Sequence, residues 1–148
     1  MEANAQFPNI RHGEGYAVGH LDDLGDGPGF RKVRKALNVT AFGVNAIVLP
    51  VGIETGFHYH DLQEELYFVH RGAIEMEFGD GSVERLQAGG LARVNPETVR
   101  RIRNVGDVDA IYLCAGGKDG YIGRDGRVRP GEEERVKATH DLSSEQPG

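Results

Sequence analysis

The sequence predicts an all-β fold of short strands, and three observations indicate it. Twenty-two glycines and six prolines in 148 residues provide many tight turns. Apolar and polar residues alternate in AIEMEF, residues 73–78, with the two-residue period of a half-buried strand. No segment keeps a helical period; the nearest to one, residues 132–142, is short and charged, so we expect a surface helix or a frayed end there. An all-β sandwich or barrel is therefore expected.

The chain is expected to fold as one domain in three parts. Residues 1–29 are polar and rich in glycine, which is typical of an irregular arm, with one short strand near residues 16–18. Residues from about 30 to 115 carry the strand patterns of the core. Residues 116–148 form a turn-rich extension, whose last residues are expected to be disordered. No internal repeat or linker indicates a second domain.

The strands of the core are expected in a definite order along the chain. β-branched and apolar residues over 39–52 predict a long strand, which Gly43 could interrupt. A second strand covers residues 64–72. Residues 73–87 then form a hairpin, because Asp80-Gly81 is a strong turn signal. The remaining strands are expected at residues 91–96, 99–105 and 110–115.

Composition and charge exclude several functional classes. The net charge is −6 and no basic cluster alternates with aromatic residues, so neither nucleic acid nor an anionic membrane is expected as a partner. No apolar run approaches the length of a membrane span, and the first residues lack the pattern of a secretory signal. A cytoplasmic location is expected. The single cysteine, Cys114, agrees with it and is predicted to be a buried small hydrophobe.

The stretch TGFHYHDLQEELYFVHRG, residues 55–72, contains a candidate metal site. His58 and His60 are two residues apart, so they project from the same side of an extended chain. A glutamate from the next strand can complete a set of two imidazoles and one carboxylate, which suits divalent Fe, Mn, Zn or Ni. Strand parity alone leaves open whether Glu64 or Glu65 faces inward, and all these residues could also be ordinary strand residues.

The same residues resemble the first motif of the cupin superfamily. That motif is a glycine, five residues, His-x-His, three or four residues, a glutamate, six residues and a glycine. Gly52, His58, His60, Glu65 and Gly72 fit this spacing without a gap, and the fit selects the second glutamate of the pair. The resemblance implies a cupin-type jelly-roll β-barrel whose pocket holds both histidines and this glutamate as metal ligands.

The second cupin motif usually supplies a histidine as a fourth metal ligand, and this chain has an arginine there. Residues 89–104, GGLARVNPETVRRIRN, resemble that motif in their glycine, their proline turn and their final asparagine. Counting back from Asn104, the histidine's place falls on Arg100, with Arg101 as the alternative shifted by one residue. A guanidinium has no free lone pair near neutral pH, so the fourth ligand of the family is missing.

Three arrangements of Arg100 are open. It could neutralise an anionic ligand beside a metal held by three residues, pair with Glu65 in a metal-free pocket, or point to solvent. A divalent ion about 5 Å from a guanidinium would be repelled by about 6–7 kcal/mol at an effective dielectric near 20. A bound anion would offset that repulsion, so the first arrangement favours a small anionic ligand.

Further polar residues are candidates for the ligand pocket. Tyr67 follows Glu65 on the same face, so its hydroxyl could contact a ligand or act as a general acid, although core packing is the commoner role. Asn45 could point into the barrel or hold a neighbouring backbone. Arg93 could add positive charge or lie on a solvated rim. Tyr67 and Arg100 are thus the candidate catalytic residues, and with Asn45 they are the candidate ligand-binding residues.

The other histidines are expected to lie outside the site. His70 is predicted on the face opposite Glu65. His12, His20 and His140 lie in the arm or the tail and are expected at the surface.

One apolar face, which carries Leu66 and Phe68, lies outside the predicted pocket. We expect the N-terminal arm or a second subunit to cover it, and the resemblance to small cupins implies a homodimer. The extension after residue 116 is expected to cover one mouth of the barrel or to pack on a partner.

The leading functional hypothesis is a pocket that holds a divalent metal and a small anionic molecule near Arg100. The alternative is a metal-free binding or regulatory module in which Arg100 and Glu65 recognise a small molecule. A structural homo-oligomer with a vestigial site is a third reading. Cupins include isomerases, dioxygenases, decarboxylases and lyases, so the resemblance decides neither the reaction nor whether the protein is an enzyme.

Overall fold

Strands dominate the structure, a computed structural model that describes residues 6–134. The strands are β1 (Arg11–Gly13), β2 (Tyr16–Val18), β3 (Gly29–Arg31), β4 (Gly43–Leu49), β5 (His58–His60), β6 (Glu64–Arg71), β7 (Ala73–Phe78), β8 (Val83–Gln87), β9 (Leu91–Val94), β10 (Arg100–Asn104), β11 (Ala110–Gly117) and β12 (Gly126–Val128). The chain also forms a 3₁₀ helix, η1 (Leu21–Leu24), and a short α-helix, α1 (Val33–Leu37), and residues 133–134 are helical at the end of the described chain. The all-β prediction is confirmed.

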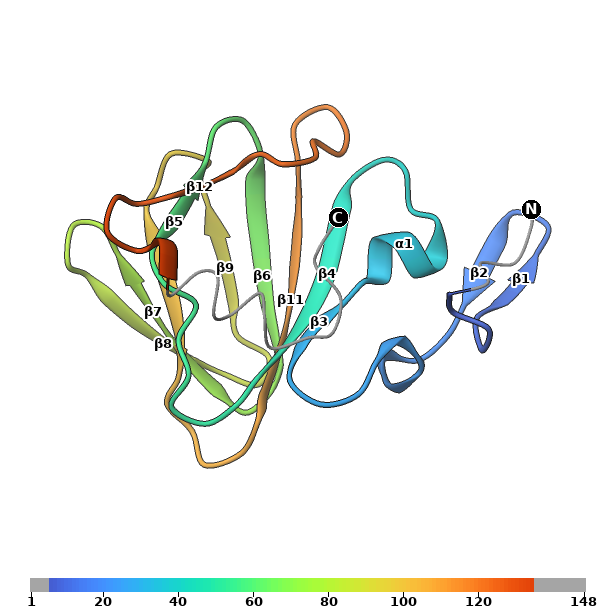
Figure 1. Cartoon of the computed structure of the whole chain (residues 1–148), viewed down its shortest axis with the longest axis horizontal. Helices are drawn as coiled ribbons and strands as arrows, with labels where there is room; N and C mark the ends of the chain where they lie inside the picture. Colours follow the sequence, from blue (N-terminus) through green and yellow to red (C-terminus); the bar gives the residue numbers. More distant parts are fainter. Residues whose placement is uncertain (1–5, 135–148) are drawn as a thin grey trace.

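Two five-stranded antiparallel sheets face each other and enclose the core (Figure 1). One sheet has the order β12-β5-β10-β7-β8 and the other the order β3-β4-β11-β6-β9. Leu49 and Val69 from the second sheet pack against Ile74 and Ile102 from the first, and all four are almost completely buried. The inward and outward residues of β6 alternate along its first six positions, as expected for a strand with one face on the core. The predicted jelly-roll arrangement is present.

The ends of the two predicted motifs anchor the strands. Asn104 is buried, and its amide nitrogen donates to the carbonyl oxygens of Leu49 and Val108, each at 2.8 Å. The end of β10 is thereby tied to the end of β4. Gly72, between β6 and β7, has φ 79° and leaves no room for a side chain, because a Cβ there would lie 3.0 Å from the Cα of Ala110. These positions explain why glycine and asparagine close the motifs.

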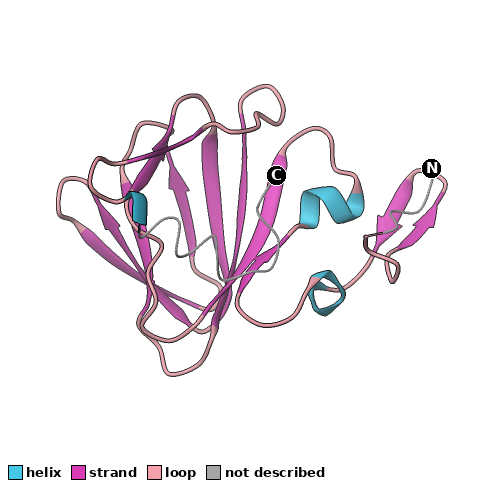
Figure 2. Cartoon of the chain, viewed as in Figure 1, coloured by secondary structure: helices cyan, strands magenta, loops and turns pink. Residues whose placement is uncertain are grey.

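The N-terminal arm has more structure than the sequence predicts. The expected strand at residues 16–18 is present and pairs with β1 in a separate two-stranded sheet, which lies beyond α1 at the far side of the molecule (Figures 1 and 2). Phe7 and Ile10 form a small second core with Ala36 of α1. The sequence analysis missed α1 because five residues are too few to show a helical period. The helix α1 ends where Asn38 takes the left-handed conformation, with φ 58°.

Two expected elements differ from those in the structure. The long strand predicted over residues 39–52 is shorter, since β4 begins at Gly43 and ends at Leu49 before Pro50. Most of the helix expected at residues 132–142 lies outside the described residues. In the described part of the chain, none of the helices is long and apolar enough to cross a membrane.

The extension after the core takes part in the first sheet. β12 pairs antiparallel with β5, so that Gly126 lies opposite His60 and Val128 opposite His58. The strand that carries both histidines is therefore held between β12 and β10. This pairing gives the C-terminal part of the described chain a direct role in shaping the site.

The apolar face on β6 is open to solvent in the described structure. Leu66 is 48% exposed, Phe68 is 38% exposed, and Leu91, which pairs with Phe68 from β9, is 62% exposed. The expectation that the arm covers this face is wrong for the described residues, because Phe7 and Ile10 of the arm pack on α1 instead. The homodimer remains a prediction.

Candidate metal centre

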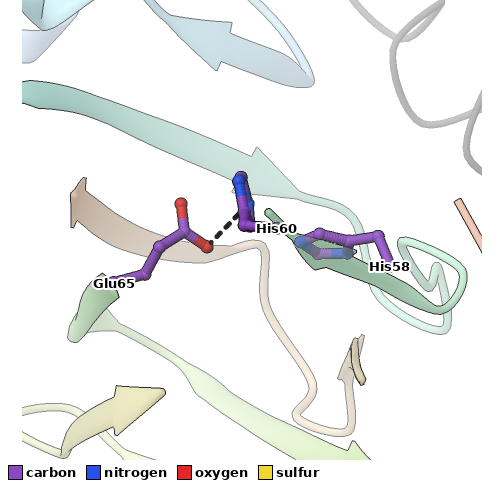
Figure 3. A group of neighbouring side chains, drawn as sticks. All are labelled: His58, His60 and Glu65. Atoms are coloured by element: carbon purple, nitrogen blue, oxygen red, sulfur yellow. Dashed lines mark ion pairs between the residues drawn. The ribbon is translucent and has the colours of Figure 1, made fainter. Parts of the chain in front are cut away.

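His58, His60 and Glu65 converge from two facing sheets (Figure 3). The two histidines are at either end of the three-residue strand β5, so their side chains share one face. Glu65 comes from β6, where it is buried and follows the inward parity of Tyr67 and Val69. The structure thus places the first-motif glutamate, and not the exposed Glu64, beside the histidines.

The donor set fits a divalent metal. One nitrogen of each histidine and one oxygen of Glu65 all lie within 4.8 Å of one another. His60 Nε2 and Glu65 Oε1 are 3.1 Å apart. In the metal-free chain this contact is a hydrogen bond, which a bound ion would replace. Nitrogen and carboxylate donors suit several first-row metals, and the remaining coordination positions would stay open.

The charges of the site also suit metal binding. Burial, together with the nearby Arg100 guanidinium, lowers the pKa of His58 from 6.5 to about 4, so its imidazole is neutral at pH 7 and offers a lone pair. Burial alone would raise the pKa of Glu65. The hydrogen bond and charge of His60, followed by the charge of Arg100, outweigh burial and lower this pKa well below its usual range. A neutral imidazole and an ionised carboxylate are the forms that bind metals.

Arg100 lies behind Glu65 and is fully buried. Its Nη2 donates to Glu65 Oε1 at 2.6 Å, and its Nε donates to the hydroxyl of Tyr67 at 3.3 Å. Its Nη1 donates to backbone carbonyl oxygens, of which the nearest are Thr98 at 2.7 Å and Pro96 at 3.2 Å. Every nitrogen of the guanidinium therefore has an acceptor within the protein.

This geometry places Arg100 behind Glu65 and away from the cavity. The side chain of Arg100 is 0% exposed and does not line the cavity described below. Its position excludes the solvent-facing arrangement and leaves it as the partner that fixes Glu65. Arg101 lies on the opposite face of β10, where it pairs with Glu54 and Glu77 and is partly exposed. The choice between the two arginines is thus resolved in favour of Arg100 as the inward residue.

Tyr67 completes the support of Glu65. Its hydroxyl donates to Glu65 Oε1 at 2.6 Å, so this oxygen faces donors from Tyr67, Arg100 and His60 at once. Burial raises the pKa of Tyr67 well above its usual value, so the hydroxyl keeps its proton. Cys114, which pairs with Tyr67 across the sheet, borders the core and the cavity. Burial, followed by the charge of Glu65, raises the pKa of its thiol.

Asp125 lies on the other side of His60, whose Nδ1 has no hydrogen-bond partner. It precedes β12, is buried, and accepts hydrogen bonds from the backbone N–H groups of Leu62 at 2.9 Å and Gln63 at 2.8 Å. Its Oδ2 also lies 3.5 Å from His60 Nδ1, while His60 Nε2 faces Glu65. A carboxylate on the far nitrogen of an imidazole is the usual way in which a metal-binding histidine is oriented.

A cavity of about 300 Å³ opens in front of the three candidate ligands. Its wall includes Tyr67 and Asn45, as predicted for candidate ligand contacts. Its wall also includes four cationic residues, Lys32, Arg34, Lys35 and Arg127. Among the described residues of the wall, Glu65 is the one carboxylate, and Arg100 already balances its charge. Arg127 also pairs with Asp61 at 2.7 Å. The wall thus carries more cationic than anionic side chains, although the whole chain has a net charge of −6.

The other candidates lie away from the cavity. Arg93 is exposed, 3.6 Å from the carboxylate of Glu64. His70 is exposed at the end of β6, as predicted, and His20 is exposed beside Asp22. His12 is half-buried in β1, contrary to the surface position expected, and both of its ring nitrogens are buried without a hydrogen-bond partner. His140 lies outside the described residues.

The sequence analysis missed the cations of α1 and the carboxylate of Asp125. Lys32 directly precedes α1, Arg34 and Lys35 lie within it, and α1 packs beside β4. A five-residue helix has too little pattern to predict that contact. Asp125 lies far from both histidines in the sequence, in a segment of turns. Only the pairing of β12 with β5 brings it to His60.

We expect the metal-free protein to lose stability as the pH falls from about 6.5 to about 4. In this range the unfolded chain protonates His58, whose ordinary pKa is 6.5, whereas the folded chain, with a pKa of about 4, does not. The resulting loss is on the order of 3 kcal/mol at the acid end. Urea unfolding with a chelator present at pH 7 and pH 4 should show a smaller loss in His58→Asn than in the wild type. Equal losses of unfolding free energy in the two proteins would show that His58 does not cause the loss of stability at acid pH.

Comparison with known proteins agrees with the geometry. The family model described as "Cupin domain" matches residues 46–116. An uncharacterized protein of Methanocaldococcus jannaschii is 31% identical over 67 residues, which are 45% of this chain and 53% of that protein. The chain thus spans about half the length of that relative.

Solved structures show the same fold. A cupin protein from Bacteroides fragilis is 27% identical with a TM-score of 0.59, over 78% of this chain and 98% of that one. A protein of Silicibacter pomeroyi, described as a sugar phosphate isomerase from a cupin superfamily, is 26% identical with a TM-score of 0.56, over 68% of this chain and 66% of that one. A double-stranded β-helix protein from Klebsiella pneumoniae has a TM-score of 0.62 at 21% identity, over 74% and 94% of the two chains.

Proposed function

Because the chain belongs to the cupin superfamily, we propose that its cavity holds a divalent metal ion and binds a small anionic molecule beside it. His58, His60 and Glu65 are the metal ligands. The observation that carries this proposal is the convergence of their donor atoms within 4.8 Å at the wall of a cavity with four cationic side chains.

The protein's own residues prepare the ligand set. Arg100 and Tyr67 fix Glu65 in position through hydrogen bonds, and the carboxylate of Asp125 lies near the far nitrogen of His60. Burial keeps His58 neutral. When bound, a metal such as Fe, Mn, Zn or Ni would supply a Lewis acid with open positions for a ligand oxygen.

The cationic wall supports an anion as the small molecule. Lys32 is the most buried of the four cations, and Arg34 stacks over the ring of Tyr121 at 4.1 Å, which leaves its charge at the cavity. Carboxylates and phosphates are the groups that such cations bind through charge-assisted hydrogen bonds. The S. pomeroyi relative, described as a sugar phosphate isomerase, agrees with an anionic ligand.

A metal-free binding module remains the second candidate. Its supporting observation is the close contact between Arg100 and Glu65 Oε1, which satisfies the carboxylate without an ion. Since Arg100 is buried, Glu65 and the cationic wall would then contact the small molecule. Both candidate functions include an anionic ligand. A measurement of the metal content of the purified protein distinguishes between them.

The anion can be tested with inorganic phosphate and succinate as probes. We expect both to bind the metal-loaded wild type. Lys32→Met should weaken binding at least about tenfold, because a charge-assisted hydrogen bond contributes about 1.5–3 kcal/mol. Lys118→Met is the matched control, since Lys118 is exposed and does not line the cavity. Calorimetric titration measures the affinity of each probe for each of the three proteins.

Two outcomes would contradict the anionic ligand. The first is that neither probe binds the wild type. The other is an equal loss of affinity in Lys32→Met and Lys118→Met, which would show that general surface charge, and not the cavity, attracts the anion.

A further inference from the structure

The cavity reaches across three strands of the second sheet. One end of its wall is Glu65 on β6, and the other end includes the cations of α1. In the sheet, β11 and then β4 follow β6, and α1 packs beside β4 (Figure 1). Neighbouring strands lie about 4.8 Å apart, so roughly 10 Å separate the backbones of β6 and β4. The candidate metal ligands and the cations of α1 are therefore too far apart for one carboxylate or phosphate group to contact both.

Glycines form the row of the wall that joins the two ends. Gly116 of β11 pairs with Glu65 on one side and with Gly43 of β4 on the other, and all three line the cavity. A Cβ at Gly116 would lie only 3.2 Å from Cγ of Glu65, so this position faces the same side as the carboxylate. Glycine in the interior of a strand often marks a place where a ligand approaches the backbone closely. The wall also includes uncharged side chains, among them Phe30, Asn45, Ile47 and Tyr112.

Tyr121 places the guanidinium of Arg34 at the far end of this row. The ring of Tyr121 lies against Gly43, where a Cβ would be 2.8 Å from it, and the guanidinium of Arg34 stacks over the same ring at 4.1 Å. Among the described residues, no carboxylate forms an ion pair with Arg34, whereas Arg127 on β12 is paired with Asp61. A stacked guanidinium presents a planar fork of donors that suits a carboxylate or phosphate group.

We propose that the ligand has two polar heads, an oxygen donor that binds the metal and a carboxylate or phosphate group that binds Arg34. This inference rests on the proposed function, which supplies the metal and the anion, and adds the distance between them. The glycine row leaves room for the chain that joins the heads, and the uncharged walls suit a largely hydrocarbon chain. The ligand class is an elongated dianion, such as a dicarboxylate or a phosphorylated carboxylic acid.

Chains with one and with two carboxylates test this inference. The probes are adipate against hexanoate, and suberate against octanoate, so the members of each pair have equal length. Each probe is titrated by calorimetry into the metal-loaded wild type, into Arg34→Met, and into the control Arg11→Met. Arg11 is exposed on β1 and does not line the cavity, so this control removes the same charge elsewhere. The wild type is also titrated in the presence of a chelator.

We expect the metal-loaded wild type and the control to bind the dicarboxylate of at least one pair about tenfold or more tightly than its monocarboxylate. The reason is that the second head adds charge-assisted hydrogen bonds at Arg34. Arg34→Met should lose this preference, because the far head then has no guanidinium. The wild type with chelator should lose it as well, because only the far head then has a partner.

The outcomes separate this inference from the proposed function. If the members of each pair bind the loaded wild type equally, or if the preference persists in Arg34→Met, the two-headed ligand is overturned while the anionic ligand stands. An equal loss of preference in Arg34→Met and Arg11→Met also overturns it, since general charge would then be the cause. A preference that survives the chelator overturns the head at the metal. If none of these probes binds, and neither phosphate nor succinate binds, both proposals fail.

Discussion

Arg100→Ala should destabilise the protein by about 3–5 kcal/mol, because it leaves the carboxylate of Glu65 buried without its cationic partner. The same change removes the donors to the backbone carbonyls of Thr98 and Pro96 in the turn before β10. Urea unfolding of the chelator-treated protein at pH 7 measures this loss as a change in the free energy of unfolding.

Arg103→Ala on the same strand is the control. Arg103 pairs with Glu75 at 3.1 Å but is 42% exposed, so its removal should cost only about 0.2–1 kcal/mol. In a second comparison, Arg100→Met combined with Glu65→Leu should be more stable than Arg100→Met alone, because no uncompensated charge remains. Similar small losses in Arg100→Ala and Arg103→Ala would show that the Arg100–Glu65 pair is not a structural anchor.

Glu65→Gln should lower the affinity for a divalent metal by at least about a hundredfold, since even the loss of an outer partner of a metal ligand costs about 10–100-fold. The glutamine oxygen can still accept from Arg100 and Tyr67, but the buried guanidinium loses its anionic partner, so urea unfolding at pH 7 checks that the variant is folded before the titration. Competition with a chromophoric chelator for Zn²⁺ or Mn²⁺ at pH 7 gives the two dissociation constants.

Glu64→Gln provides the matched control for this variant. Glu64 is the neighbouring residue, but its side chain is exposed beside Arg93 on the outer face of β6. We expect its metal affinity to equal that of the wild type. Equal losses in the two variants would mean that the glutamate of the site does not bind metal and only adds negative charge nearby.

Much of the candidate site could be predicted from spacing. A His-x-His pair puts both imidazoles on one face of a strand. The resemblance to the cupin motif selected Glu65, which the structure places beside them. The position of Arg100 could also have been derived. In Arg100–Asn104, Ile102 and Asn104 share parity with Arg100 and are buried, whereas Arg101 and Arg103 pair with glutamates of β7.

The remaining parts of the site depend on contacts between distant segments. Asp125 meets His60 only because β12 joins the edge of β5, and a three-residue strand has too little pattern to predict that pairing. Lys32 and Arg34 reach the cavity through a single turn of helix. The anionic ligand was expected at Arg100, whose guanidinium is fully buried. We now expect the anion at Lys32 and Arg34 and at Lys35 and Arg127, which line the cavity.

Metal content tests the central claim most directly. The wild type should be purified without chelator and without a histidine-rich tag, beside His58→Ala and the control His70→Ala, whose histidine is exposed on β6. Elemental analysis should find close to one equivalent of a divalent metal in the wild type and in His70→Ala, and almost none in His58→Ala. A wild type without metal, which also fails to bind Mn²⁺, Fe²⁺, Zn²⁺ or Ni²⁺ when each is added, would contradict the three-ligand site and leave the metal-free binding module.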